Sequence, residues 1–227
     1  MELGMKRRYV LSVVMVALLV MAVGLRLFGP KEPSYEGVTL TEWLKLSSWR
    51  AVELGTNMSK AERLEKTRRA VKAIGTNAIP TLLALMNAKE EPIKCKILSW
   101  MGRHSVPSPH IMDTFEARYV AALGFEMLGH DALPAAPALV ALMQNTDGDI
   151  RTRALQSLCA INPGKAFLLP ALWQGFYDPD DEVHFFARNE LRLHFPDELG
   201  LEKPASATQF RAQPSGTNYF YSPKSYK

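Results

Sequence analysis

Apolar and polar positions in the second half of the chain repeat at a fixed interval. Two sets of apolar residues recur every 33 residues. They are Ala121, Ala154 and Ala187, and Phe125, Leu158 and Leu191. A unit of this length holds one antiparallel helix pair and is too short to fold alone, so it has to bury its apolar face against its neighbours. The pattern therefore predicts an all-α fold, an α-solenoid of stacked helix pairs.

Within each unit, turn and capping residues separate two runs of helical periodicity. The predicted helices span 113–128, 133–144, 149–161, 167–176 and 181–195. Further upstream, Thr39 and Glu42 have the spacing of a helix-initiating capping box, and so do Ser59 and Glu62. The second box begins a helix whose partner follows within 77–86, and residues 92–101 are predicted to form the next helix.

Breaks in this periodicity divide the chain into segments. We expect residues 1–29 to form a signal anchor, 30–38 a linker, 39–202 the repeat domain and 203–227 a disordered tail. Two prolines interrupt the repeat domain at about 103–110, which predicts an inserted loop. The tail is assigned as disordered because it is rich in Ser, Pro and Gln and has no periodicity.

The N-terminal segment has the pattern of a membrane-targeting sequence. Three basic residues at 6–8 precede an apolar run at 10–25. This run is near the lower limit for crossing a hydrocarbon core of about 30 Å, and it exceeds the apolar region typical of a cleaved signal. We expect one transmembrane helix, with the N-terminus cytoplasmic and the repeats extracytoplasmic. Cleavage after Gly24 is the alternative, which would release a secreted or periplasmic protein.

Charge is unevenly distributed along the chain, whose net charge is +4 and whose pI is about 9.0. Residues 35–104 hold 12 Lys and Arg against 7 Asp and Glu, whereas 105–200 hold 6 against 13. No basic stripe follows the repeats, which argues against a nucleic-acid partner. The charge difference between the two halves is consistent with solvated helix faces that carry acidic caps. The alternative is that residues 60–103, in the basic half, form a surface that contacts a protein or a lipid.

Candidate chemistry is sparse. Cys95 and Cys159 are predicted to lie on helices about two repeats apart, too far for a disulfide, so both thiols are expected to be free. His104 and His110 match no metal motif, and the acidic run at 178–182 is interpreted as helix capping. No nucleophile elbow, phosphate-binding loop or HExxH motif occurs. We therefore expect no catalytic residues, no metal and no cofactor.

Residues 147–158 resemble the first helix of a HEAT repeat, in which an acid at the turn precedes a β-branched residue, Arg, Ala and Leu. Residues 180–187 repeat the pattern. The resemblance implies a right-handed solenoid in which an Asp-to-Arg ladder links adjacent layers. Asp147 and Arg151 hold the ladder positions of one unit and Asp180 and His184 those of the next, where His replaces the expected Arg.

Residues 35–44 and 73–80 are also similar to bacterial exported HEAT-repeat proteins. This resemblance implies the fold and says little about activity. Because solenoids mostly bind other proteins and no catalytic motif occurs, we expect a membrane-anchored, non-catalytic scaffold whose protein partner the sequence does not identify. Some HEAT-like repeats occur in phycobilisome lyases, so an accessory or lyase-like enzyme component is the alternative. In helix-pair solenoids the second helices line the concave surface, and Trp173, rotated about 100° from the core residue Leu172, is the predicted contact for a partner.

Overall fold

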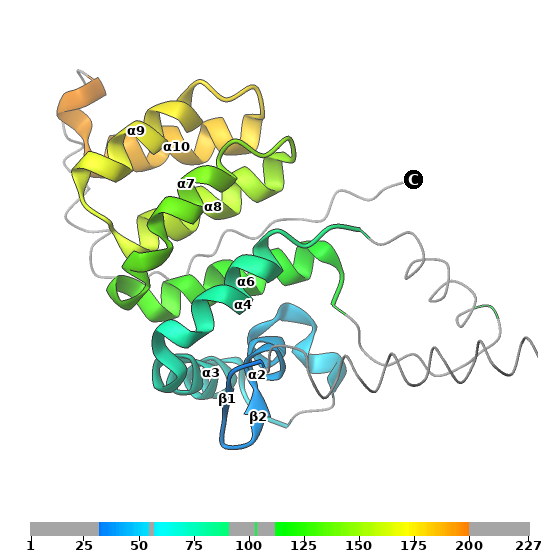
Figure 1. The fold of residues 1–227 in the computed structure, drawn as a ribbon. Coiled ribbons are helices and arrows are strands. Elements are labelled where there is room, and N and C mark those ends of the chain that lie inside the picture. Colours follow the sequence, from blue (N-terminus) through cyan, green and yellow to red (C-terminus); the bar gives the residue numbers. More distant parts are fainter. Residues whose placement is uncertain (1–31, 55–56, 91–102, 104–111, 200–227) are drawn as a thin grey trace, which may run out of the picture.

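A computed structural model describes residues 32–54, 57–90, 103 and 112–199 (Figure 1). The described residues are mostly helical, as the periodicity predicted. The α-helices are α2 (Leu40–Ser47), α3 (Lys60–Ile74), α4 (Ile79–Met86), α6 (Thr114–Leu128), α7 (Ala136–Leu142), α8 (Gly148–Ile161), α9 (Lys165–Phe176) and α10 (Asp181–His194). The 3₁₀ helices are η1 (Trp49–Leu54), η2 (Gly75–Ala78), η3 (Gly129–Ala135) and η4 (Pro196–Leu199).

Several predictions fall outside the described residues. These are the anchor at 1–29, the helix at 92–101 with Cys95, the loop at 103–110 apart from Arg103, and the tail at 203–227. In the part of the chain that the structure describes, no helix is both long and apolar enough to cross a bilayer.

Several helices begin at residues whose side chains accept from backbone N–H groups that lack a partner within the helix. At the start of α3, the Ser59 hydroxyl accepts from the Glu62 N–H while the Glu62 carboxylate accepts from the Ser59 N–H, so the predicted capping box is present. Asp113, Asp147 and Asp180 cap α6, α8 and α10 through their carboxylates. The interpretation of acidic residues as helix caps is therefore confirmed at these positions.

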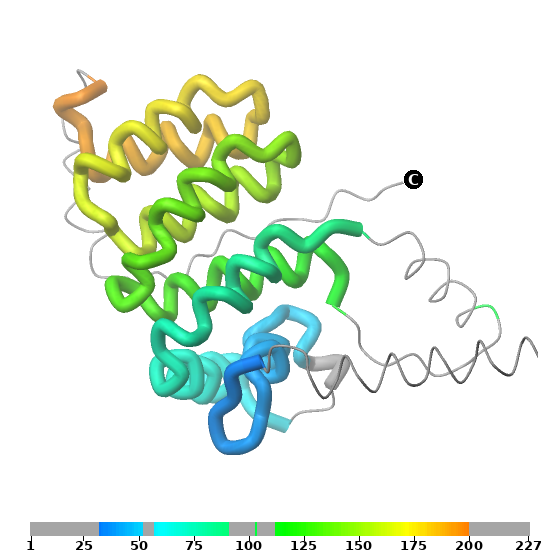
Figure 2. Tube along the Cα trace, viewed as in Figure 1, coloured from blue at the N-terminus to red at the C-terminus, as the bar shows by residue number. Residues whose placement is uncertain are grey.

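The helices pack in the order of the sequence. Helix α6 packs against α3, α4 and α8, and α8 packs in turn against α7, α9 and α10. Figures 1 and 2 show α4, α7 and α9 on one side of the molecule and α6, α8 and α10 on the other. The 33-residue spacing marks the interior between these two rows. All six residues of the two predicted sets are fully buried.

The N-terminal edge differs from the prediction. Residues 34–39, which the sequence assigned mostly to a linker, form a short antiparallel hairpin of β1 (Ser34–Tyr35) and β2 (Val38–Thr39). The Trp43 indole N–H donates to the carbonyl oxygen of Tyr35 at 3.1 Å, and the two rings lie 6.3 Å apart. These contacts hold the hairpin against α2. The sequence did not predict them because the interval between residues 35 and 43 carries no periodic signal that indicates such contacts.

Candidate binding surfaces

Charged side chains near the start of the first helix in a pair, such as α6 or α8, link that pair to the next one. Arg151 of α8 donates to both carboxylate oxygens of Asp178, which precedes α10, at 2.7 and 2.8 Å. Both side chains are largely buried. Hydrogen bonding to Asp178 raises the pKa of the Arg151 guanidinium, while burial opposes that shift. This two-pronged contact therefore joins α8 to the turn that follows α9.

The preceding layer has a related contact. Arg118 of α6 reaches Asp147 at 2.8 Å and Asp149 at 3.1 Å, and it also donates to the Ala88 carbonyl oxygen. A shallow pocket of about 300 Å³ lies beside these groups, lined partly by Lys89 and Arg118. Two of its wall residues, Arg118 and Asp147, already pair with each other across the layers.

The predicted ladder residues are placed differently from one another. Asp147 contacts Arg118 of the preceding helix pair, as the ladder requires. Arg151 takes Asp178 as its acid, whereas Asp180, the predicted position, caps α10 and donates its own N–H to Asp178. His184 forms no interlayer ion pair with another described residue, and its Nδ1 lies within hydrogen-bonding distance of the Phe176 carbonyl oxygen. The acid that bonds Arg151 therefore lies two residues before the ladder position Asp180.

Trp173, the predicted partner contact, lies in an aromatic cluster at the end of α9. Its ring is 5.3 Å from Phe176 in an edge-on arrangement and 5.9 Å from Tyr177 in a stacked one. Trp173 is half-buried and packs against the core, so its ring points only partly away from the interior. Tyr177 is the most exposed member of the cluster, with 76% of its surface accessible.

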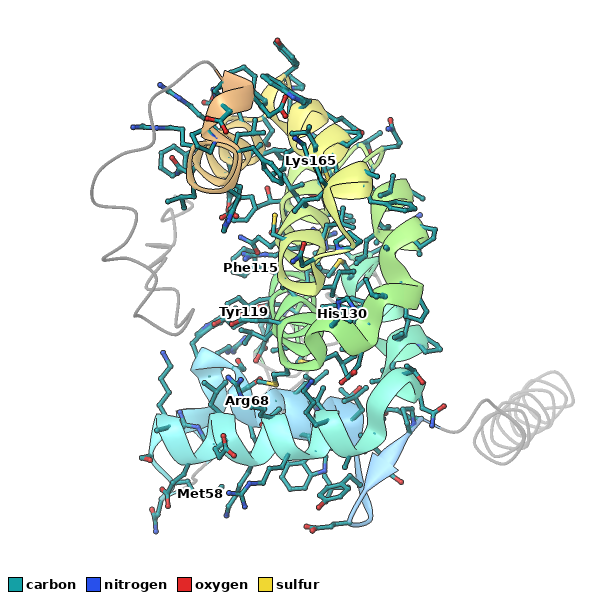
Figure 3. The ribbon with its side chains drawn as sticks, turned by 90° about the vertical axis from the view of Figure 1, so that its left-hand side faces the viewer. Met58, Arg68, Phe115, Tyr119, His130 and Lys165 are labelled. Atoms are coloured by element: carbon teal, nitrogen blue, oxygen red, sulfur yellow. The ribbon has the colours of Figure 1, made fainter. Side chains whose placement is uncertain are left out.

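A second aromatic surface is formed by residues that lie far apart in the sequence. We call it the Trp49 patch, and it comprises Trp49 of η1, Phe115 and Tyr119 of α6, and Arg153 of α8. The Trp49 ring meets Phe115 at 5.6 Å and Tyr119 at 5.0 Å, both edge-on, and 48% of Trp49 is exposed. Figure 3 shows Phe115 and Tyr119 on the same side of the molecule, above Arg68 of α3.

Polar contacts on both sides of Trp49 fix η1 against α6. The Ser48 hydroxyl donates to the buried carboxylate of Glu116. On the other side, Arg50 lies 3.4 Å from Asp113 and 3.9 Å from Glu116. Because the residues before and after Trp49 are both tied to the start of α6, its ring is held over Phe115 without being buried.

Arg153 completes the patch from the neighbouring layer. Its guanidinium carbon lies 5.3 Å from the centre of the Phe115 ring and 5.6 Å from that of Tyr119, within cation–π range. Asp149 and Gln156 accept from its N–H groups and orient its plane. Burial raises the pKa of the Tyr119 phenol, while the Arg153 charge opposes that shift. The patch is therefore preformed from rings in edge-on contact, and about half of the Trp49 surface is accessible.

The sequence missed the Trp49 patch for a physical reason. Residues 49–54 carry no helical period, and nothing local indicates that the partners of Trp49 on α6 lie about two repeats away. The one available signal is aromatic: Phe115 and Tyr119 lie four residues apart, on one face of a predicted helix.

As for metals, no group of three or more His, Cys, Asp or Glu side chains in the described ranges is placed to hold an ion.

Comparison with protein-family models, with curated proteins and with solved structures gave no match for this chain.

Proposed function

We propose that this protein is a non-catalytic scaffold that binds another protein on the extracytoplasmic side of a bacterial membrane. In this proposal residues 1–29 anchor the chain, and the helix pairs belong to a right-handed solenoid of HEAT-like repeats. The sequential packing of the helices and the contacts Arg118 to Asp147 and Arg151 to Asp178 support the solenoid. The basic residues at 6–8 support the orientation.

The observation that carries the binding function is the half-exposed ring of Trp49, held in place on two other aromatic rings and beside Arg153. Trp, Tyr and Arg are the residue types that contribute most energy at protein interfaces. A ring already fixed by its neighbours loses little conformational entropy on binding.

Site-specific photo-crosslinking in intact cells tests this proposal. The full chain would carry p-benzoylphenylalanine at position 49 or, as a control, at position 69, where Arg69 is exposed on α3. We expect a discrete protein adduct from position 49 and none of that mass from position 69. Identification of the adduct by mass spectrometry would then name the partner.

The interaction would next be measured with purified components. Trp49→Ala is expected to weaken partner binding by about thirtyfold or more, the effect of losing an interface residue worth about 2 kcal/mol. The Arg69→Ala variant is expected to bind as the native chain does. Identical adducts from positions 49 and 69, or an unchanged affinity for Trp49→Ala, would refute the role of the patch.

A further inference from the structure

Helix α10 carries an exposed stripe along the face opposite its buried residues. The stripe comprises Asp181, Phe185, Arg188 and Arg192, and we call it the α10 stripe. Its members are separated by four, three and four positions, which places them on one side of an α-helix. Phe185 lies in the middle of the stripe with 58% of its surface exposed. Large apolar residues at this level of exposure, between charged ones, are typical of contact surfaces.

The equivalent side of α8 is covered. One period of 33 residues upstream, Thr152 takes the place of Phe185, and Leu155 takes the place of Arg188. Thr152 is 1% exposed and Leu155 is 0% exposed, because α9 and α10 pack on α8. Within the described residues, α10 thus presents to solvent the side on which α8 receives the next helix pair. Figures 1 and 2 show α9 and α10 at the end of the stack.

The order of charges along the stripe makes it self-complementary. Asp181 lies at the N-terminal end and Arg192 at the C-terminal end, and neither they nor Arg188 form an ion pair with any other described residue. If two copies of α10 lie antiparallel about a two-fold axis between positions 186 and 187, Asp181 stands opposite Arg192 of the partner subunit. Phe185 then stands opposite Arg188 of the partner subunit. Each contact occurs twice, as in any two-fold interface.

We propose that a second copy of this chain docks on the α10 stripe and forms a two-fold symmetric dimer. Two Asp181 to Arg192 ion pairs set the antiparallel register, and two stacked Phe185 and Arg188 pairs fill the centre of the interface. A single helix pair buries less than the roughly 800 Å² per partner of a stable interface, so the dimer forms reversibly with concentration. The site is separate from the Trp49 patch and does not depend on it.

Charge reversal gives a sharp test because the interface is symmetric. Asp181→Arg leaves only basic residues at both ends of the stripe, and Arg192→Asp leaves an acid at each end. The full chain of each variant, in density-matched detergent, would be examined by sedimentation equilibrium. We expect the native chain to show a monomer–dimer equilibrium. In each single variant we expect the dimer dissociation constant to rise by about tenfold or more. The double variant should dimerise again.

Mixing the two single variants is the decisive measurement. An Asp181→Arg chain and an Arg192→Asp chain are complementary at both ends, so labelled and unlabelled copies should form a heterodimer that neither forms alone. Asp197→Arg, an equal charge change on the exposed η4, serves as the control and should leave the native equilibrium unchanged. Melting curves would establish that every variant is folded.

Three results would overturn the proposal. They are a native chain that stays monomeric at every accessible concentration, a dimer insensitive to both charge reversals, and a mixture of single variants with no heterodimer. The first two would arise if another segment of the same chain occupied the stripe. If one variant fails to fold, the other still reports the loss of association, since Asp181 and Arg192 lie at opposite ends of α10.

Discussion

Arg151 and Asp178 form a two-pronged ion pair that spans the boundary between successive helix pairs. Nη2 donates to Oδ1 at 2.7 Å and Nε donates to Oδ2 at 2.8 Å. The Asp178 carboxylate also accepts from the N–H of Asp180, which in turn caps α10. One carboxylate therefore joins α8 to the start of α10, and its loss affects both the interlayer contact and the turn.

Removing the Asp178 charge should destabilise the fold. Asp178→Asn leaves the Arg151 guanidinium, 11% exposed, without its anionic partner. We expect a loss of about 2 kcal/mol in the free energy of unfolding, measured by thermal or chemical denaturation. As the control, Arg69→Gln breaks the exposed pair with Glu65 and should cost less than about 0.5 kcal/mol. Equal losses in the two variants would contradict the assignment.

The same pair predicts a pH dependence. Burial alone would raise the pKa of Asp178, but hydrogen bonds from Arg151 and the Asp180 N–H, together with the Arg151 charge, lower it overall. A carboxyl whose pKa is lowered by folding stabilises the protein above its unfolded pKa of about 3.9. That stability is lost as pH falls through the lower, folded value.

The measurement is the difference in melting temperature between the native chain and Asp178→Asn from pH 7 to pH 3. Taking the difference removes the contribution of other carboxylates. We expect a constant difference above about pH 5 that shrinks below about pH 4. A difference that grows with acidification would mean that the Asp178 pKa is raised by folding instead.

Close packing between the last helices predicts the effect of a single methyl group. A Cβ at Gly175 of α9 would lie 2.9 Å from the Cβ of Ala187 and 2.9 Å from a methyl group of Leu155. The Ala187 Cβ moves only with the α10 backbone. We expect Gly175→Ala to cost about 1–3 kcal/mol from overpacking, partly offset by the higher helix propensity of Ala.

Melting of Gly175→Ala would be compared with that of Ala84→Gly, which exchanges the same residue types at an exposed position of α4. Ala84→Gly should cost about 1 kcal/mol from propensity alone. If Gly175→Ala is as stable as the native chain or more so, the α9 to α10 contact is looser than described.

Residue spacing predicted the helices because each one buries a periodic face, and the residues of that face, such as Phe125 and Leu158, are neighbours in the core. Capping was readable for the same reason, since Ser59 and Glu62 act within one turn. The contacts that the sequence did not reveal involve residues far apart along the chain. Trp49 packs on α6, and Arg151 bonds Asp178 and not Asp180, the ladder position. Two acids so close in sequence are equivalent in pattern and differ only in three dimensions.

The Cys159 thiol should react slowly. Burial raises its pKa well above the ordinary value, and the nearby Glu190 carboxylate raises it further. In a full-length Cys95→Ser chain, alkylation by iodoacetamide at pH 8 should be at least about tenfold slower than for the same chain in denaturant, because the thiolate is the nucleophile. Glu190→Gln should speed the reaction without restoring the denatured rate. A rate equal to that of the denatured chain would contradict this.

Trp173 and Tyr177 separate packing from binding at the end of α9. Trp173 is half-buried against the core, so Trp173→Ala should cost about half of the roughly 3–5 kcal/mol of a fully buried aromatic. Tyr177 is 76% exposed and stacks on Trp173 from outside, so Tyr177→Ala should change stability by less than about 0.5 kcal/mol. The two losses would be measured from melting curves.

The sequence predicted Trp173 as a partner contact. If the aromatic cluster is such a contact, a photoreactive residue at position 177 should crosslink a protein in intact cells. Trp173→Phe should then reduce the amount of that adduct while the fold is kept. Trp173→Phe is the informative substitution because it retains an aromatic ring against the core and removes the rest of the indole. Binding that survives in Trp173→Phe, with a stability loss confined to Trp173→Ala, would make Trp173 a packing residue. The Trp49 patch would then be the remaining candidate for the contact.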